Sequence, residues 1–137
     1  MIGLNMIKMK NEFVSYEMAL SLKELGFDEP CFTYYKNDQL SNILELVKNS
    51  EMKNVNNEVD NYISAPTFSK AFRFFRKRHG LYGLYTMGDY ENNFYWQIWR
   101  NDSITKTYIT ASNYVFETYE EAELACLLKL IEIVKNK

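Results

Sequence analysis

The sequence predicts an α+β fold in which a small, mostly antiparallel sheet of three to five strands packs against three helices. Two observations predict it. First, three segments place apolar residues at helical spacing after a hydroxyl residue. Second, β-branched and aromatic runs joined by short turns lie between the second and third of these helical segments. The 137 residues are 47% hydrophobic with a net charge of −2, so we expect residues 1–137 to form a single domain.

The first two predicted helices follow Ser15 and Thr67, whose hydroxyls can accept an N–H of the first helical turn. The first covers residues 16–25. The second runs to His79, with Pro66 near its first position, where the missing N–H costs nothing.

The third predicted helix covers about residues 119–134 and follows Thr118, which forms a capping box with Glu121. It is apolar over most of its circumference, which indicates burial on several sides or a place in an oligomer interface. A second apolar stripe is the candidate for that interface, and it consists of Leu124, Leu128 and Ile131.

The predicted strands alternate side chains between two faces. They cover residues 32–35, 81–86, 93–100 and 104–110, with a further short strand at 114–116. Between the first two of them lies an asparagine-rich segment in which only residues 40–47 contain several apolar residues. These residues are predicted to form a short helix or a strand. Residues 48–60 lack periodicity, which predicts an exposed loop.

One face of the second predicted helix is basic. Its cations lie within about 120° on the helical wheel, which is typical of a surface for phosphates or an acidic partner but also of an ordinary solvated face. They are Lys70, Arg73, Arg76 and Lys77.

The predicted strand 93–100 carries aromatic side chains on both faces. If helices cover one face, the other exposes Tyr95 and Trp99, and Tyr82 on the preceding strand adds to them. Aromatic side chains beside cations suit a protein interface and also suit base stacking. A sheet packed on both faces remains the alternative.

No motif of a catalytic or cofactor site is present, so we expect neither enzymatic activity nor a cofactor. Cys31 and Cys126 are predicted to be free thiols, and one His with two distant Cys gives no metal spacing. His79 falls on the apolar side of its helix, which favours a place at the core edge.

The N-terminus lacks the apolar core of a secretory signal, and no apolar run is long enough to span a membrane. We therefore expect a cytoplasmic protein without a membrane partner.

Three blocks of the sequence, residues 12–27, 65–81 and 117–131, carry a resemblance over about half the chain. Together they resemble small uncharacterised proteins encoded by phages and prophage-like elements of gut bacteria. The resemblance implies a short viral accessory protein made in the cytoplasm of a bacterial host. It implies no activity and no site residues.

The resulting hypothesis is a non-enzymatic, phage-type accessory protein that binds a host or viral macromolecule, with a protein partner favoured. One alternative is single-stranded nucleic-acid binding through the basic helix 70–78 and the aromatic strand 93–100. Another is a small enzyme with a carboxylate or His79 site. Homo-oligomerisation through the apolar stripe Leu124, Leu128 and Ile131, called the leucine stripe below, also remains open.

Overall fold

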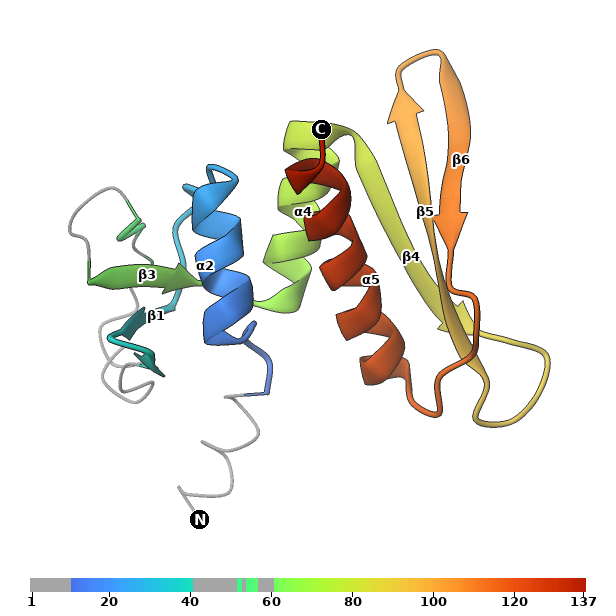
Figure 1. Cartoon of the computed structure of the whole chain (residues 1–137), viewed down its shortest axis with the longest axis horizontal. Helices are drawn as coiled ribbons and strands as arrows, with labels where there is room; N and C mark the ends of the chain where they lie inside the picture. Colours follow the sequence, from blue (N-terminus) through green and yellow to red (C-terminus); the bar gives the residue numbers. More distant parts are fainter. Residues whose placement is uncertain (1–10, 41–51, 53, 57–60) are drawn as a thin grey trace. The chain divides into compact units, whose positions relative to one another are not determined.

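The computed structural model describes residues 11–40, 52, 54–56 and 61–137 (Figure 1). The chain divides into two compact units, Met1–Ala71 and Phe72–Lys137, and the described residues of each form a three-stranded antiparallel sheet. With three helices in the described part, the predicted α+β class is confirmed. Most of the predicted element at 40–47 and most of the predicted loop at 48–60 lie outside the described residues; Leu40 is described and lies in a strand.

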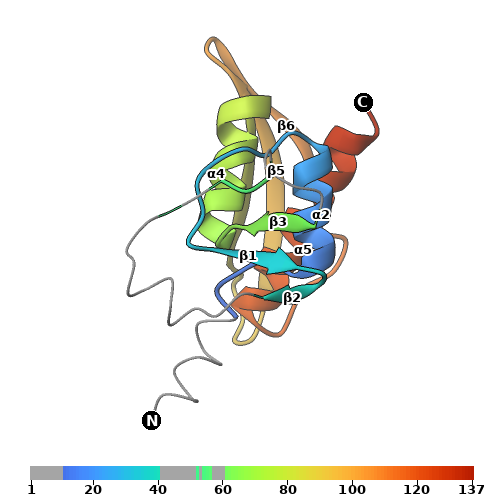
Figure 2. The same cartoon turned by 90° about the vertical axis from the view of Figure 1, so that its left-hand side faces the viewer.

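Among its described residues, the first unit contains helix α2 and a sheet of strand order β2-β1-β3 (Figure 2). The bounds are α2 Tyr16–Glu24, β1 Thr33–Lys36, β2 Gln39–Leu40 and β3 Tyr62–Ala65. The helix packs against β3 and contributes Met18, Ala19 and Leu22 to the core. Its apolar spacing, read from the sequence, therefore marks the face that the sheet covers.

Strand β3 was not predicted, and the asparagine-rich segment helps to hold it in place. The side chain of Asn56 accepts the Ser64 N–H at 2.8 Å and donates to the Phe27 carbonyl at 2.8 Å. Val55 is buried, and its N–H donates to Ser64 Oγ at 2.9 Å. At Val55, part of the predicted exposed loop is thus anchored in the core.

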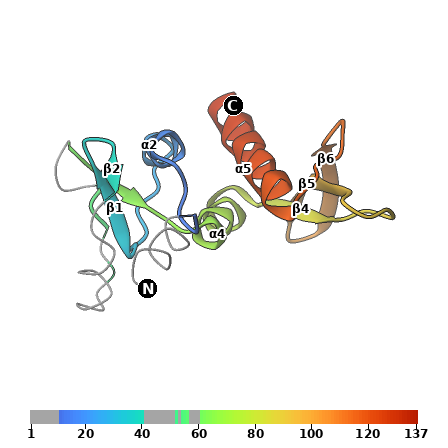
Figure 3. The ribbon, with the colours of Figure 1, turned by 90° about the horizontal axis from the view of Figure 1, so that it is seen from below.

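The second unit contains α4 (Phe68–His79), which begins in the first unit, and α5 (Tyr119–Lys135). Its sheet has the order β4-β5-β6, with bounds Leu81–Met87, Phe94–Asp102 and Thr105–Ala111. Helix α5 packs against β4 and β5 (Figure 3). The predicted strand at 114–116 forms only an isolated bridge between Phe116 and Phe94.

Gly83 shows that α4 and α5 cover the same face of this sheet. A Cβ built on Gly83 would lie 2.8 Å from Phe72 Cε1 of α4 and 2.8 Å from Cys126 Sγ of α5. Leu81, Trp96 and Ile98 are also buried. The core of the unit therefore lies between one sheet face and two helices.

The three helices of the described part of the chain each begin with the predicted hydroxyl cap. Ser15 Oγ accepts the Met18 N–H at 3.3 Å, and Thr67 Oγ1 accepts the Lys70 N–H at 3.2 Å. Pro66 precedes the cap instead of occupying the first helical position, and its carbonyl accepts the Val14 N–H.

The cap of α5 departs from the predicted reciprocal pair. Thr118 Oγ1 accepts the Glu121 N–H at 3.1 Å, as expected. The Glu121 carboxylate accepts the N–H of Glu117, at 3.3 Å, and thus reaches one residue further back than a capping box requires.

None of the helices in the described part of the chain combines the length and apolar character needed to cross a membrane.

Candidate functional site

One face of the β4-β5-β6 sheet has no helix over it within residues 72–137, all of which the structure describes (Figure 3). Strand β5 directs Trp96 and Ile98 toward the helices, and both are buried. Its alternate residues, including Tyr95 and Trp99, point to the uncovered face. We call this surface the open face. Its residues are Tyr82, Leu84, Tyr95, Gln97, Trp99, Asn101, Lys106 and Tyr108.

The open face contains a hollow of about 430 Å³. Trp99 is held in it by two contacts. The indole N–H donates to Gln97 Oε1 at 3.1 Å, and the ring lies edge-on to Tyr108 with centroids 5.5 Å apart. Tyr82 is the cross-strand partner of Trp99. These two contacts set the orientation of the Trp99 ring on the open face.

The hollow is mostly apolar in character. Leu84 is 52% exposed beside Trp99, although it is a large aliphatic side chain in the middle of a strand. Lys106 is the single charged residue in the lining, since the others are Tyr82, Leu84, Gln97, Trp99 and Asn101. Such a surface gains free energy when another apolar surface covers it.

The structure places Tyr82, Tyr95 and Trp99 on one sheet face, where Tyr82 and Trp99 line the hollow and Tyr95 lies outside it. It does not join the helix cations to them. Helix α4 packs through Phe72 on the opposite face of the sheet. Its exposed Arg73 belongs to that helix side, as do Arg76 and Lys77. The predicted contact surface is thus two surfaces.

Lys70 has a local role in the first unit. Its ammonium group donates to the carbonyl of Pro30 and lies 3.6 Å from Met52 Sδ. It therefore ties the start of α4 to the turn after α2.

Sequence reasoning missed Leu84, Lys106 and Tyr108 as members of the open face. The signal was present in the alternation of β4 and β6. It can be read only with the strand register, which pairs Leu84 with Gln97 and Tyr108 with Trp99. A shift between Ile98 and Trp99 in the pairing with β6 also breaks the simple alternation.

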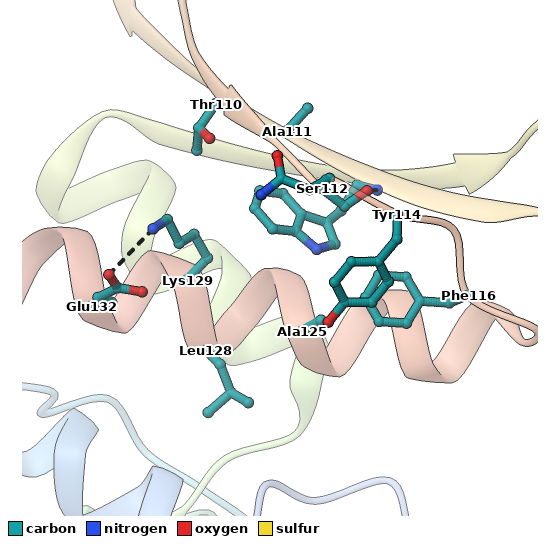
Figure 4. Close-up of a pocket in the computed structure, with 11 residues that line it drawn as sticks. Thr110, Ala111, Ser112, Tyr114, Phe116, Ala125, Leu128, Lys129 and Glu132 are labelled. Atoms are coloured by element: carbon teal, nitrogen blue, oxygen red, sulfur yellow. Dashed lines mark hydrogen bonds and ion pairs between the residues drawn. The ribbon is translucent and has the colours of Figure 1, made fainter.

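A second hollow, of about 290 Å³, lies on the helix side of the sheet, between α5 and the segment that follows β6 (Figure 4). Figure 4 shows Tyr114 and Phe116 at one end and Lys129 with Glu132 at the other. The Lys129 Nζ and Glu132 Oε1 atoms form an ion pair at 3.2 Å. We call this hollow the α5 cavity.

The perturbed titratable groups are spread over both units. Burial is the main cause that raises the pKa of the Cys31 and Cys126 thiols to about 12, and both cysteines are free. Burial also raises the pKa of Tyr85, and the Glu123 carboxylate adds to the shift. Among the described residues, no group of three His, Cys, Asp or Glu side chains could hold a metal ion.

His79 lies at the edge of the core. Its ring stands 5.5 Å from Phe74 and 5.9 Å from Phe75, measured between centroids. Burial lowers the pKa of the imidazole, and the charges of Lys137, Arg78 and Arg100 lower it further. Burial and the neighbouring positive charges therefore both favour the neutral imidazole of His79.

The three residues of the leucine stripe differ in exposure. Leu124 is 41% exposed and Leu128 is 50% exposed, whereas Ile131 is buried. An interface on α5 would thus use the two leucines. Self-association through them remains a hypothesis.

Comparisons with protein-family models, with curated proteins and with solved structures find no match to this chain. The resemblance to phage-encoded proteins therefore stays an expectation. Function is inferred from the surfaces themselves.

Proposed function

We propose that this chain is a non-enzymatic binding protein, a phage-type accessory protein of the bacterial cytoplasm, and that its open face docks a partner protein. The observation that carries the proposal is the uncovered position of Tyr82, Tyr95 and Trp99 on one sheet face. Trp and Tyr are the residues in which binding energy concentrates at protein interfaces. Trp99 is already oriented, so less conformational entropy is lost when a partner covers it.

A protein partner suits the open face better than single-stranded nucleic acid does. Aromatic rings could stack bases, but a nucleic-acid groove also needs cations along the phosphate backbone. The hollow supplies only Lys106, and Arg73, Arg76 and Lys77 lie on the other side of the sheet. The net charge of −2 gives no long-range attraction for phosphates.

The test is affinity capture from bacterial host lysate with and without nuclease, using the wild type and Trp99→Ala. Loss of a central Trp anchor costs about 2 kcal/mol or more, so Trp99→Ala should weaken capture about 30-fold. The matched control is Tyr90→Ala, because Tyr90 is also aromatic and exposed but lies in the turn between β4 and β5. Capture that survives Trp99→Ala would overturn the proposal.

The nuclease arm and a direct titration separate the two kinds of partner. We expect nuclease to leave capture unchanged, and we expect no binding of single-stranded oligonucleotides at low salt. Salt-dependent oligonucleotide binding that Trp99→Ala removes would instead establish the nucleic-acid alternative.

A further inference from the structure

The rim of the α5 cavity is hydrogen-bonded to strand β5. The Trp96 N–H donates to Ser112 Oγ at 3.3 Å, and the Ser112 N–H donates to the Trp96 carbonyl at 3.0 Å. Phe116 and Phe94 exchange two further backbone hydrogen bonds at 2.7 and 2.9 Å. The segment after β6 is therefore hydrogen-bonded to β5 at Ser112 and at Phe116.

The lining of the cavity is polar at one end and aromatic at the other (Figure 4). The Tyr114 and Phe116 rings lie 5.0 Å apart, and Tyr114 is largely exposed. Thr110 and Ser112 add hydroxyls to the lining, with Ser112 drawn on the Tyr114 side. Ala125 is the short side chain of α5 in the lining, so the helix leaves the space unfilled there.

The charges in the lining select against an ionic ligand. Lys129 and Glu132 neutralise one another, so a lone anion would meet the carboxylate and a lone cation would meet the ammonium. Lys can only donate hydrogen bonds and an ionised Glu can only accept them. A ligand hydroxyl does both, so adjacent hydroxyls on one molecule can satisfy both side chains at once.

The aromatic end favours a ligand with an apolar ring face. The C–H groups of a saturated ring carry partial positive charge, and the face of an aromatic ring is negative. A volume of about 290 Å³ lies at the lower end of small-molecule sites, which limits the ligand to about one ring. We propose that the α5 cavity binds a neutral sugar of monosaccharide size, with its C–H face on Tyr114 and its hydroxyls at Lys129 and Glu132.

Tryptophan fluorescence provides a test that is independent of the open face. The chain has two Trp, so Trp99→Phe leaves Trp96, which lines the cavity, as the sole reporter. The probes are glucose, galactose, mannose and N-acetylglucosamine, with free leucine and phenylalanine as zwitterionic comparisons. We expect a saturable change at millimolar concentration with one or more sugars and none with the amino acids. The proposal is wrong if no sugar changes the signal, or if the amino acids change it and the sugars do not.

Two substitutions in the Trp99→Phe background tie binding to the cavity. Ala125→Leu fills the space and should weaken binding about tenfold or more. Glu132→Gln keeps the size of the side chain but loses the charged acceptor, and should weaken binding roughly tenfold. Glu120→Gln is the matched control, since Glu120 is an exposed residue of the first turn of α5 outside the cavity.

The two variants keep the inference falsifiable even if the core tolerates one of them poorly. Circular dichroism establishes whether Ala125→Leu is folded. If it is not, the contrast between Glu132→Gln and Glu120→Gln decides. Equal sugar affinity in those two variants would contradict the assignment.

Discussion

Gly83 is a residue at which the two helices and the sheet of the second unit approach one another closely. The position has no side chain, and Phe72 Cε1 and Cys126 Sγ occupy the space where a Cβ would stand. Leu130 Cδ1 would lie 3.1 Å from a Cβ at position 83. Three side chains from two helices thus fix this position, and none of them belongs to the strand that contains it.

Gly83→Ala should lower the free energy of unfolding by about 1–3 kcal/mol, because an added methyl overpacks a filled core. Urea denaturation measures it. Leu84→Ala is the control in the next position, where the exposed side chain should matter by less than about 0.5 kcal/mol. Cys126→Ala should recover part of the loss in a double mutant, because it removes one of the two closest atoms. Equal stability of Gly83→Ala and wild type would contradict the packing described.

At the residue scale the sequence predicted the two faces of β5 but not which one is covered. The alternation separates Trp96 from Trp99 whatever the fold. Which of the two faces is covered depends on Phe72 and Cys126. Phe72 belongs to a helix that precedes the sheet in the chain, and Cys126 belongs to one that follows it. Gly83 lies on the covered face, where the helices leave no room for a side chain. A glycine in a strand also marks bulges and turns, so the sequence pattern alone does not identify the covered face.

The helices were the most predictable elements. All three predicted helices begin within the expected residues because the hydroxyl cap and the apolar spacing are local signals. Strand β3 was missed because its place depends on Asn56, a side chain eight positions earlier that takes the Ser64 N–H. Asparagine normally indicates a loop, so the asparagine-rich segment gave no indication that it supports a neighbouring strand.

Thr118→Ala should lower the free energy of unfolding by about 1 kcal/mol, since the Glu121 N–H loses its acceptor. Thermal or urea unfolding measures it. Thr118→Ser keeps the hydroxyl and should retain most of the stability. The same comparison at Ser15, with Ser15→Ala against Ser15→Thr, should give a similar difference for α2. If Thr118→Ala and Thr118→Ser are equally stable, the cap is not what holds the start of α5.

At the scale of the whole molecule, the two thiols link stability to alkaline pH. Cys31 lies in the first unit and Cys126 in the second, and the pKa of each is raised from 9.0 to about 12. Between these values the unfolded chain releases both thiol protons while the folded chain keeps them. The contribution is therefore fully present below pH 9 and is lost as the pH rises toward 12.

We expect the free energy of unfolding to fall above pH 9, by roughly 1.4 kcal/mol per pH unit for each thiol. Urea denaturation at a series of pH values measures the slope. Cys126→Ala should be less stable at neutral pH but should show a shallower decline above pH 9. Parallel curves for the variant and the wild type would show that this thiol ionises equally in both states.

The close approach at Gly83 also constrains how this chain can diverge. A lineage that replaces Gly83 with a larger residue must first accept a smaller residue at position 72 or 126, because the reverse order passes through an overpacked intermediate. The three positions should therefore change in a fixed historical order, although they are far apart in the sequence. Relatives with a side chain at position 83 should carry a smaller residue at one of the two helix positions.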